Sequence, residues 1–160
     1  MREPRPIPGA RVPLFDRLVD LCPELADDER PFRILDRNQL KASIRRELER
    51  LLNTRCSLPL HRVGEEERSV INYGIPDFSS LSAQNADDHA LISSVISRTI
   101  TAFETRLRNV SVEVQPIPRC ENALYVSIDA VMSVGWFNEP VYFPVVLNNK
   151  NGTAEIHDSE

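Results

Sequence analysis

The stretch that decides the fold is residues 87–107, DDHALISSVISRTITAFETRL. Its apolar residues are Ile92, Val95, Ile96, Ile100, Phe103 and Leu107. This three- and four-residue spacing places them on one face of a helix. Asn85 is a candidate N-cap, and the two aspartates that open the stretch put negative charge where the helix dipole favours it. We expect this helix to be the central packing element and its last turn, at Glu104 and Arg106, to be the recognition feature.

Beyond this helix, the period of the apolar residues changes from 3.6 to 2, which is typical of half-buried strands. Three such stretches lie at residues 110–115, 124–133 and 141–147. Because their links are short and hold no crossover helix, the strands should form an antiparallel meander. The turn signal Asn151-Gly152 predicts a short fourth strand at residues 153–156.

Pro144 falls inside the third of these stretches, although proline cannot donate a hydrogen bond to a neighbouring strand. It therefore belongs at a sheet edge or at a bulge. If the fourth strand forms, the third strand has neighbours on both sides, and the sequence then predicts a bulge.

Upstream of the central helix, Asp36 and Gln39 form a capping-box pattern at the start of another amphipathic helix. Its apolar face holds Leu40, Ile44, Leu48, Leu51 and Leu52. On the charged face, Glu47 and Arg50 are three residues apart and can pair, and Asn53 is a reasonable C-terminal stop.

The order of the elements, helices first and strands afterwards, predicts an α+β fold. In this fold the N-terminal helices pack on one face of a C-terminal antiparallel sheet of three to four strands.

Residues 1–13 hold four of the twelve prolines and are expected to be extended and poorly ordered on their own. Residues 14–21 carry a short apolar stripe that Pro23 ends. This stripe is either a short helix docked on its own domain or an amphipathic arm that docks on a partner. We therefore divide the chain into an N-terminal arm with a short helix, residues 1–34, and an α+β domain, residues 35–160.

Residues 69–77, SVINYGIPD, are predicted to form a structured loop packed on the core. The side chains that can be buried there are Val70, Ile71, Tyr73 and Ile75. Gly74 permits positive φ, but no glycine-rich cradle follows it, so a phosphate-binding loop is not indicated.

The composition of the 160-residue chain, 41% apolar and 27% charged, is ordinary for one globular domain. A net charge of −5 argues against a general nucleic-acid binder. The arginines clustered between residues 45 and 68 could still form a local basic face, and that alternative stays open. No apolar run approaches the roughly 18–20 residues that span a bilayer, so membrane insertion is not expected. No secretory signal is visible, which favours a cytoplasmic protein.

Residues for catalysis or metal binding are sparse. The histidines are dispersed at His61, His89 and His157. The cysteines are Cys22, Cys56 and Cys120, and this odd, scattered set is typical of reduced cytosolic thiols. Glycoside hydrolysis requires two carboxylates about 5–9 Å apart, and Glu104 with Asp129 is the one pair that could be nominated. We expect no metal site, no cofactor and no catalytic residues.

Glu104 and Arg106 lie two residues apart, so on an ideal helix they point to different sides and are not expected to pair with each other. One of them can fix the end of the helix while the other reaches a partner protein. The alternative is two ordinary charges at a helix terminus, where the dipole favours an arginine.

Three segments, taken in order, resemble the TssE family of type VI secretion systems, which is similar to the phage baseplate wedge protein often labelled lysozyme-like. They are SIRRELERLLNTR at residues 43–55, SVINYGIPDFSSL at residues 69–81 and ITAFETRLRNVSVEV at residues 100–114. LFDRL at residues 14–18 also looks like the start of TssE proteins. The resemblance extends through the final strands and the turn at Asn151-Gly152, so it covers nearly the whole chain.

This resemblance implies a small α+β subunit of the cytoplasmic, membrane-docked baseplate, and no enzyme. In the family, the subunit joins the wedge built by TssF, TssG and TssK and starts polymerisation of the contractile TssB–TssC sheath. The implied mechanism is strand templating, in which an exposed sheet receives strands from the first sheath ring.

The family's glutamate–proline–arginine signature falls on Glu104, Thr105 and Arg106. The resemblance implies that the two charged residues keep their contacts to partner proteins, whereas Thr105 replaces the proline and leaves open whether the backbone kinks there. Two alternatives stay open: a peptidoglycan-cleaving, lysozyme-like enzyme, and a small adaptor or regulator of the same fold, because a fold alone does not decide function.

Overall fold

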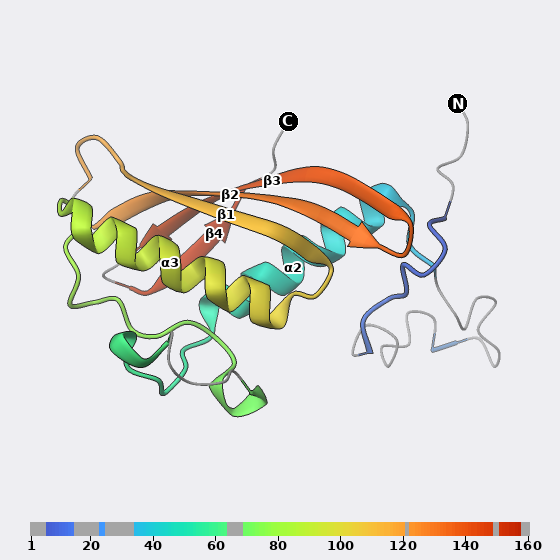
Figure 1. Cartoon of the computed structure of the whole chain (residues 1–160), viewed down its shortest axis with the longest axis horizontal. Helices are drawn as coiled ribbons and strands as arrows, with labels where there is room; N and C mark the ends of the chain where they lie inside the picture. The colour runs from blue at the N-terminus through green and yellow to red at the C-terminus, as the bar shows by residue number, and fades with distance from the viewer. Residues whose placement is uncertain are drawn as a thin grey trace.

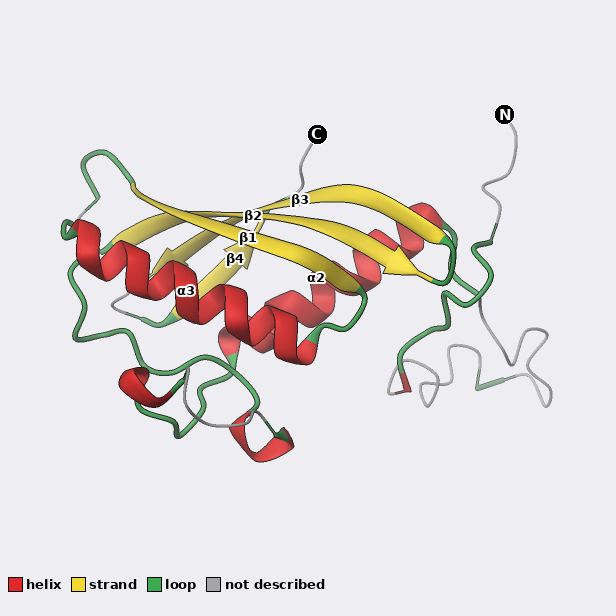
Figure 2. Cartoon of the chain, in the orientation of Figure 1, coloured by secondary structure: helices red, strands yellow, loops and turns green. Residues whose placement is uncertain are grey.

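The computed structural model describes residues 6–14, 23–24, 34–63, 69–120, 122–148 and 151–157. Its elements are α2 (Arg37–Asn53), the 3₁₀ turns η1 (Leu60–Arg62) and η2 (Val70–Asn72), α3 (Ala86–Phe103), β1 (Leu107–Pro116), β2 (Ala123–Val134), β3 (Phe137–Asn148) and β4 (Thr153–Ile156). Figure 1 shows α2 and α3 on the same side of the curved sheet. Figure 2 shows the same two layers coloured by secondary structure. The predicted α+β class is confirmed.

Both helices begin with the caps that the sequence predicts. The Asp36 carboxylate accepts a hydrogen bond from the Gln39 backbone N–H at 2.9 Å, and the Gln39 side chain accepts one from the Asp36 N–H at 3.1 Å. The Asn85 side chain accepts from the Asp87 N–H at 3.1 Å at the start of α3. These local bonds satisfy backbone donors that a helix cannot pair internally, which fixes the first residue of each helix.

The sheet is an antiparallel meander in the order β1-β2-β3-β4, so the predicted fourth strand is confirmed. β2 and β3 are joined by the two-residue turn Gly135-Trp136, where Gly135 has φ +61°. Alternate residues of the strands form the core with the helices, and those of β2 and β3 are Leu124, Val126, Ile128, Ala130, Met132, Val141, Phe143, Val145 and Leu147. We call the face that these residues occupy the inner face.

Pro144 lies at a sheet edge, and the bulge predicted for it is wrong. The register between β2 and β3 is unbroken through Pro144, and β4 ends at Ile156, opposite Val145. The Pro144 carbonyl accepts from the His157 N–H at 2.9 Å, which shows that the backbone of Pro144 points away from β2. The missing proline N–H therefore costs no hydrogen bond between β2 and β3. The bulge lies in β1 instead, between Arg108 and Ser111.

The described part of the N-terminal segment packs on the domain, and its poor order on its own stays a prediction. Ile7, Ala10 and Val12 are buried. The Ile7 N–H donates to the Leu35 carbonyl at 2.9 Å, and the Leu35 N–H donates to the Ala10 carbonyl at 2.8 Å. The pattern PIPGARV was too proline-rich to show this burial, because its partners lie elsewhere in the chain. The short helix predicted at residues 14–21 lies outside the described residues, except for Leu14.

The loop before α3 is only partly buried, so its prediction was wrong at two residues. Ile75 is fully buried, and Gly74 at φ +109° brings its backbone so close to Thr54 that a Cβ would lie 2.4 Å from the Thr54 carbonyl oxygen. Val70 and Ile71, however, are 88% and 83% exposed. They lie in η2, whose hydrogen bonds close the turn on itself rather than onto the core.

Candidate functional site

The predicted site lies in the turn that follows α3. The last residue of the helix is Phe103, so the turn begins at Glu104. Glu104 is the C-cap, with φ −104° and ψ 82°, and its N–H donates to the Ile100 carbonyl at 2.8 Å. The Leu107 N–H then donates to the Glu104 carbonyl at 3.1 Å, which turns the chain into β1. We call Glu104, Thr105, Arg106 and Ser43 the helix-end site.

Glu104 and Arg106 form a two-pronged ion pair, which corrects the expectation that they point to different sides. The Arg106 Nε and Nη2 donate to the two Glu104 carboxylate oxygens at 2.8 and 2.6 Å. The Arg106 backbone N–H donates to the same carboxylate at 3.1 Å. The expectation assumed helical geometry at both residues, but Glu104 has already left the helix, so its side chain swings toward residue 106.

The pair is mostly shielded from solvent and is tied to α2. The Glu104 side chain is 7% exposed and the Arg106 side chain 18%. The Arg106 Nη1 also donates to the Ser43 hydroxyl at 3.0 Å, and Ser43 is buried on the inner side of α2. A shielded charge is tolerated only where it is paired and hydrogen-bonded, and both conditions hold here. The pair therefore joins α2, the end of α3 and the start of β1.

A shallow cleft of about 260 Å³ opens beside the pair. Its lining comes from the N-terminal segment, α2, the loop before α3 and the helix-end site, and consists of Arg11, Pro13, Glu47, Leu51, Tyr73, Phe103, Glu104, Thr105 and Arg106. The rings of Tyr73 and Phe103 meet edge to face with centroids 5.2 Å apart. Burial, followed by the Glu47 charge, raises the pKa of Tyr73. The cleft combines aromatic walls with charged groups, a composition suited to receiving a protein side chain.

Thr105 occupies the place of the proline in the resembled signature, and the turn forms without it. Thr105 is exposed and lies in a turn with negative φ. No hydrogen bond of its N–H is found within the described residues. Because neighbouring residues hold the turn, the kink does not depend on proline.

Both outer edges of the sheet are held by side chains in the described part of the chain. The Asn53 amide donates to the Ala154 carbonyl and accepts from the Ala154 N–H, both at 2.9 Å, so it replaces a further strand beside β4. On β1, the Ser93 and Ser97 hydroxyls of α3 donate to the Val112 and Val110 carbonyls at 2.6 and 3.0 Å. Covering an edge in this way limits unspecific strand pairing.

The structure does not bring together the side chains that glycoside hydrolysis or metal binding would need. Glu104 lies on the helix side of the sheet, whereas Asp129 is exposed on the opposite face, between the buried Ile128 and Ala130. His89 Nε2 donates to the Ala83 carbonyl at 2.9 Å, within its own helix-capping loop. No group of three or more potential metal ligands occurs among the residues that the structure describes.

Sequence reasoning found Glu104 and Arg106 but missed the residues that hold or surround them. Ser43 carried a signal, because it is a polar residue three after Leu40 on the apolar stripe of α2. Tyr73 and Phe103 were predicted as residues that can be buried, but no local pattern predicts their contact, since it joins a loop to a helix end. Among the described residues, neither helix is long and apolar enough to be a membrane span.

Comparison with known proteins gives one match. The family model described as baseplate wedge protein gp25 matches residues 38–135, from the first turn of α2 to the β2–β3 turn. This is more than half of the chain, and it includes the whole helix-end site. No curated protein matches the chain, and neither does any solved structure.

Proposed function

The chain belongs to the family of the baseplate wedge protein gp25, and from this membership we propose that it is a structural baseplate subunit of a type VI secretion system. The observation that carries the proposal is the family match over both helices and the helix-end site. The three segments that resemble TssE favour a type VI secretion system, rather than a phage, as the assembly that contains this subunit. In this proposal the subunit is cytoplasmic, belongs to a membrane-docked baseplate and catalyses no reaction.

The wedge partners in this proposal are TssF, TssG and TssK, and the helix-end site is where TssF–TssG bind. The Glu104–Arg106 pair holds the turn after α3 in one shape, and the cleft beside it receives a partner side chain. The geometry supports this because the pair leaves part of Arg106 exposed at the cleft. A preformed turn and cleft reduce the entropy lost on binding.

The second part of the proposal is that the sheet templates the first ring of the TssB–TssC sheath by strand addition. Of the two edge strands, β1 is better suited to pair with an incoming strand, because it has ten residues whereas β4 has four. Along the regular part of β1, the N–H group of Val112 points to the same side as the carbonyl that Ser93 holds. An incoming strand displaces the Ser93 and Ser97 hydroxyls, each worth about 1 kcal/mol net, and replaces them with a ladder of main-chain bonds.

Co-expression with TssF and TssG tests the partner role. We expect Glu104→Ala and Arg106→Ala to reduce recovery of the complex, because each removes half of the pair that shapes the site. Arg108→Ala is the matched control, since Arg108 is exposed on β1 just beyond the site. Thermal melting of each purified variant identifies any loss that is due to unfolding. Undiminished recovery with both site variants would refute the role of these residues.

A further inference from the structure

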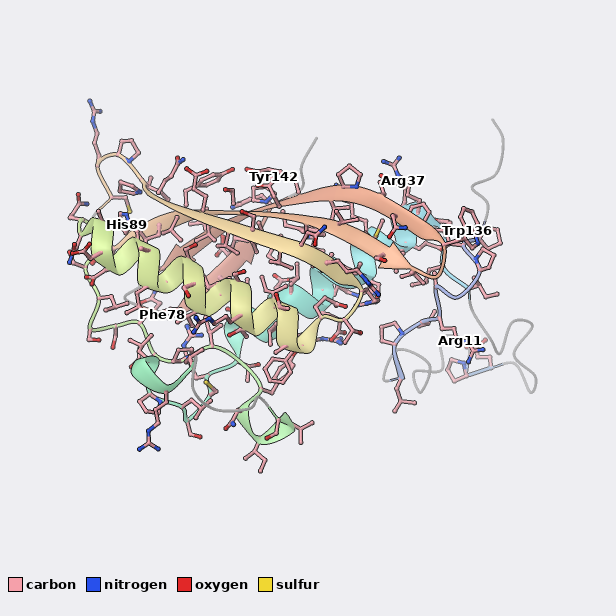
Figure 3. The ribbon with its side chains drawn as sticks, in the orientation of Figure 1. Arg11, Arg37, Phe78, His89, Trp136 and Tyr142 are labelled. Atoms are coloured by element: carbon pink, nitrogen blue, oxygen red, sulfur yellow. The ribbon has the colours of Figure 1, made fainter. Side chains whose placement is uncertain are left out.

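The outer face of the sheet, opposite the helices, carries an apolar stripe along β3. Alternate residues of β3 are buried against the helices, and Phe143 is one of them. The residues between them point outward and are Pro140, Tyr142, Pro144 and Val146. β3 is therefore apolar on both faces, a pattern typical of strands that are covered on both sides. Figure 3 shows Tyr142 on the side of the sheet away from α3.

β2 widens this stripe into a patch. Val131 lies opposite Pro140 and Tyr125 lies opposite Val146, so both side chains share the outer face. The hydroxyl groups of Tyr125 and Tyr142 contact each other near the centre. We call these six residues the outer patch: Tyr125, Val131, Pro140, Tyr142, Pro144 and Val146. Tyrosines beside apolar side chains are the composition of protein-binding hot spots.

Carboxylates lie within and beside the outer patch. The cross-strand register places Asp129 beside Tyr142, Glu113 on the row of Pro144 and Glu155 beside Val146, all on the outer face. The hydrogen bond with Tyr125 is the main cause that raises the pKa of Tyr142 to about 12. Burial and the charges of Tyr125, Asp129 and Glu113 make smaller contributions. The register places Arg108 opposite Val131, at the other end of the patch. Around Tyr142, Pro144 and Val146 the charged neighbours that the register gives are these three carboxylates, so this part of the rim is negative.

The shape of the patch fits a helix better than a strand. Residues 140–146 extend about 20 Å along β3, which equals the length of about 13 helical residues. Three neighbouring strands are about 10 Å wide, close to the diameter of a helix. A second copy of this chain would set one negative rim against another, and the chain already carries a net charge of −5.

We infer that the outer patch binds an amphipathic helix of another protein, with apolar residues on one side and lysine or arginine along its flanks. The apolar side covers Pro144, Val146 and the tyrosine pair, and the basic flanks meet Asp129, Glu113 and Glu155. The helix would give the sheet a second covering layer and make its outer face a core. This surface is distinct from the helix-end site and does not depend on which assembly the chain joins.

Site-specific photo-cross-linking in the cells that make the protein tests this inference. The photoreactive residue benzoylphenylalanine replaces Val146, and the cross-linked peptide is identified by mass spectrometry. We expect a peptide from another chain, with apolar residues three and four apart and several lysines or arginines. The same photoreactive residue at Leu91, which is 38% exposed on α3, is the matched control and should not capture that peptide.

A charge reversal makes the test specific. Asp129→Lys, combined with the photoreactive residue at position 146, should reduce the adduct at least about tenfold, because like charges then face each other across the contact. Glu49→Lys, an exposed reversal on α2, should leave it unchanged. Circular dichroism checks that both variants are folded. The inference fails if the captured peptide comes from this chain, is acidic or uncharged, or is unaffected by Asp129→Lys, and equally if no adduct forms at Val146.

Discussion

At the scale of single residues, Arg106 explains most about the helix-end site. Its planar guanidinium donates two roughly parallel hydrogen bonds to Glu104 and a third, along another direction, to Ser43. Lysine could not reproduce this geometry, because its ammonium is a point charge without a fixed fork. The cost of shielding two charges is offset here by near-complete hydrogen bonding.

Removing one partner of this pair should destabilise the fold. Glu104→Gln leaves the Arg106 guanidinium shielded without its counter-charge, and we expect the free energy of unfolding in urea to fall by about 2 kcal/mol. Arg106→Met in the same background should cost much less than it does alone, because the interaction is already lost. Strict additivity of the two substitutions would show that the pair contributes no coupling energy.

Tyr142 gives a second residue-scale prediction. Its pKa of about 12 in the folded chain lies above the ordinary value of 10, so the folded state holds this proton more tightly than the unfolded state. The resulting stabilisation is complete below pH 10 and is lost as the pH rises toward 12. Tyr125→Phe should lower the pKa of Tyr142 toward 10, as measured by NMR titration of labelled tyrosine. A pKa that does not change would mean that the hydroxyl contact is not its main cause.

At the scale of elements, Asn53 joins the end of α2 to the edge strand β4. Its two bonds satisfy both outward backbone groups of Ala154, a residue that is 3% exposed. An unpaired buried backbone group costs about as much as a lost hydrogen bond, so this one side chain secures a strand of four residues.

Asn53→Ala should therefore loosen β4. We expect a loss of about 2 kcal/mol in the free energy of unfolding and much faster hydrogen exchange at the Ala154 amide. Hydrogen exchange is the decisive measurement, because alanine also raises the helix propensity at position 53. Glu49→Ala, one turn earlier on α2, is the control. If the Ala154 amide exchanges at its original rate, Asn53 does not protect this edge.

The same elements show how far the sequence could predict this fold. Asp36 and Asn85 were predictable as caps because each bonds within three residues, and the strands were predictable from alternation. The Asn53–Ala154 contact joins residues 101 positions apart, so no local pattern contains it. The Glu104–Arg106 pair is local, but it depends on the exact residue at which α3 ends, the least predictable property of a helix.

At the scale of the whole molecule, two helices on one face of a sheet leave three kinds of surface to which we assign protein partners. The helix-end site lies where α3 meets β1, the β1 edge carries outward backbone groups, and the outer patch covers the face without helices. A subunit of 160 residues can thus present different surfaces to different neighbours. Such an arrangement suits assembly within a baseplate, the role of the family to which the chain belongs.

We propose that the chain works by binding other chains in a secretion baseplate and transforms no substrate. Affinity purification of the tagged full chain from its native cells, followed by quantitative mass spectrometry, tests this proposal. We expect strong enrichment of TssF, TssG and TssK, with sheath subunits, and loss of the wedge proteins in Arg106→Ala. Recovery of none of these proteins, together with degradation of purified cell-wall sacculi by the isolated chain, would contradict it.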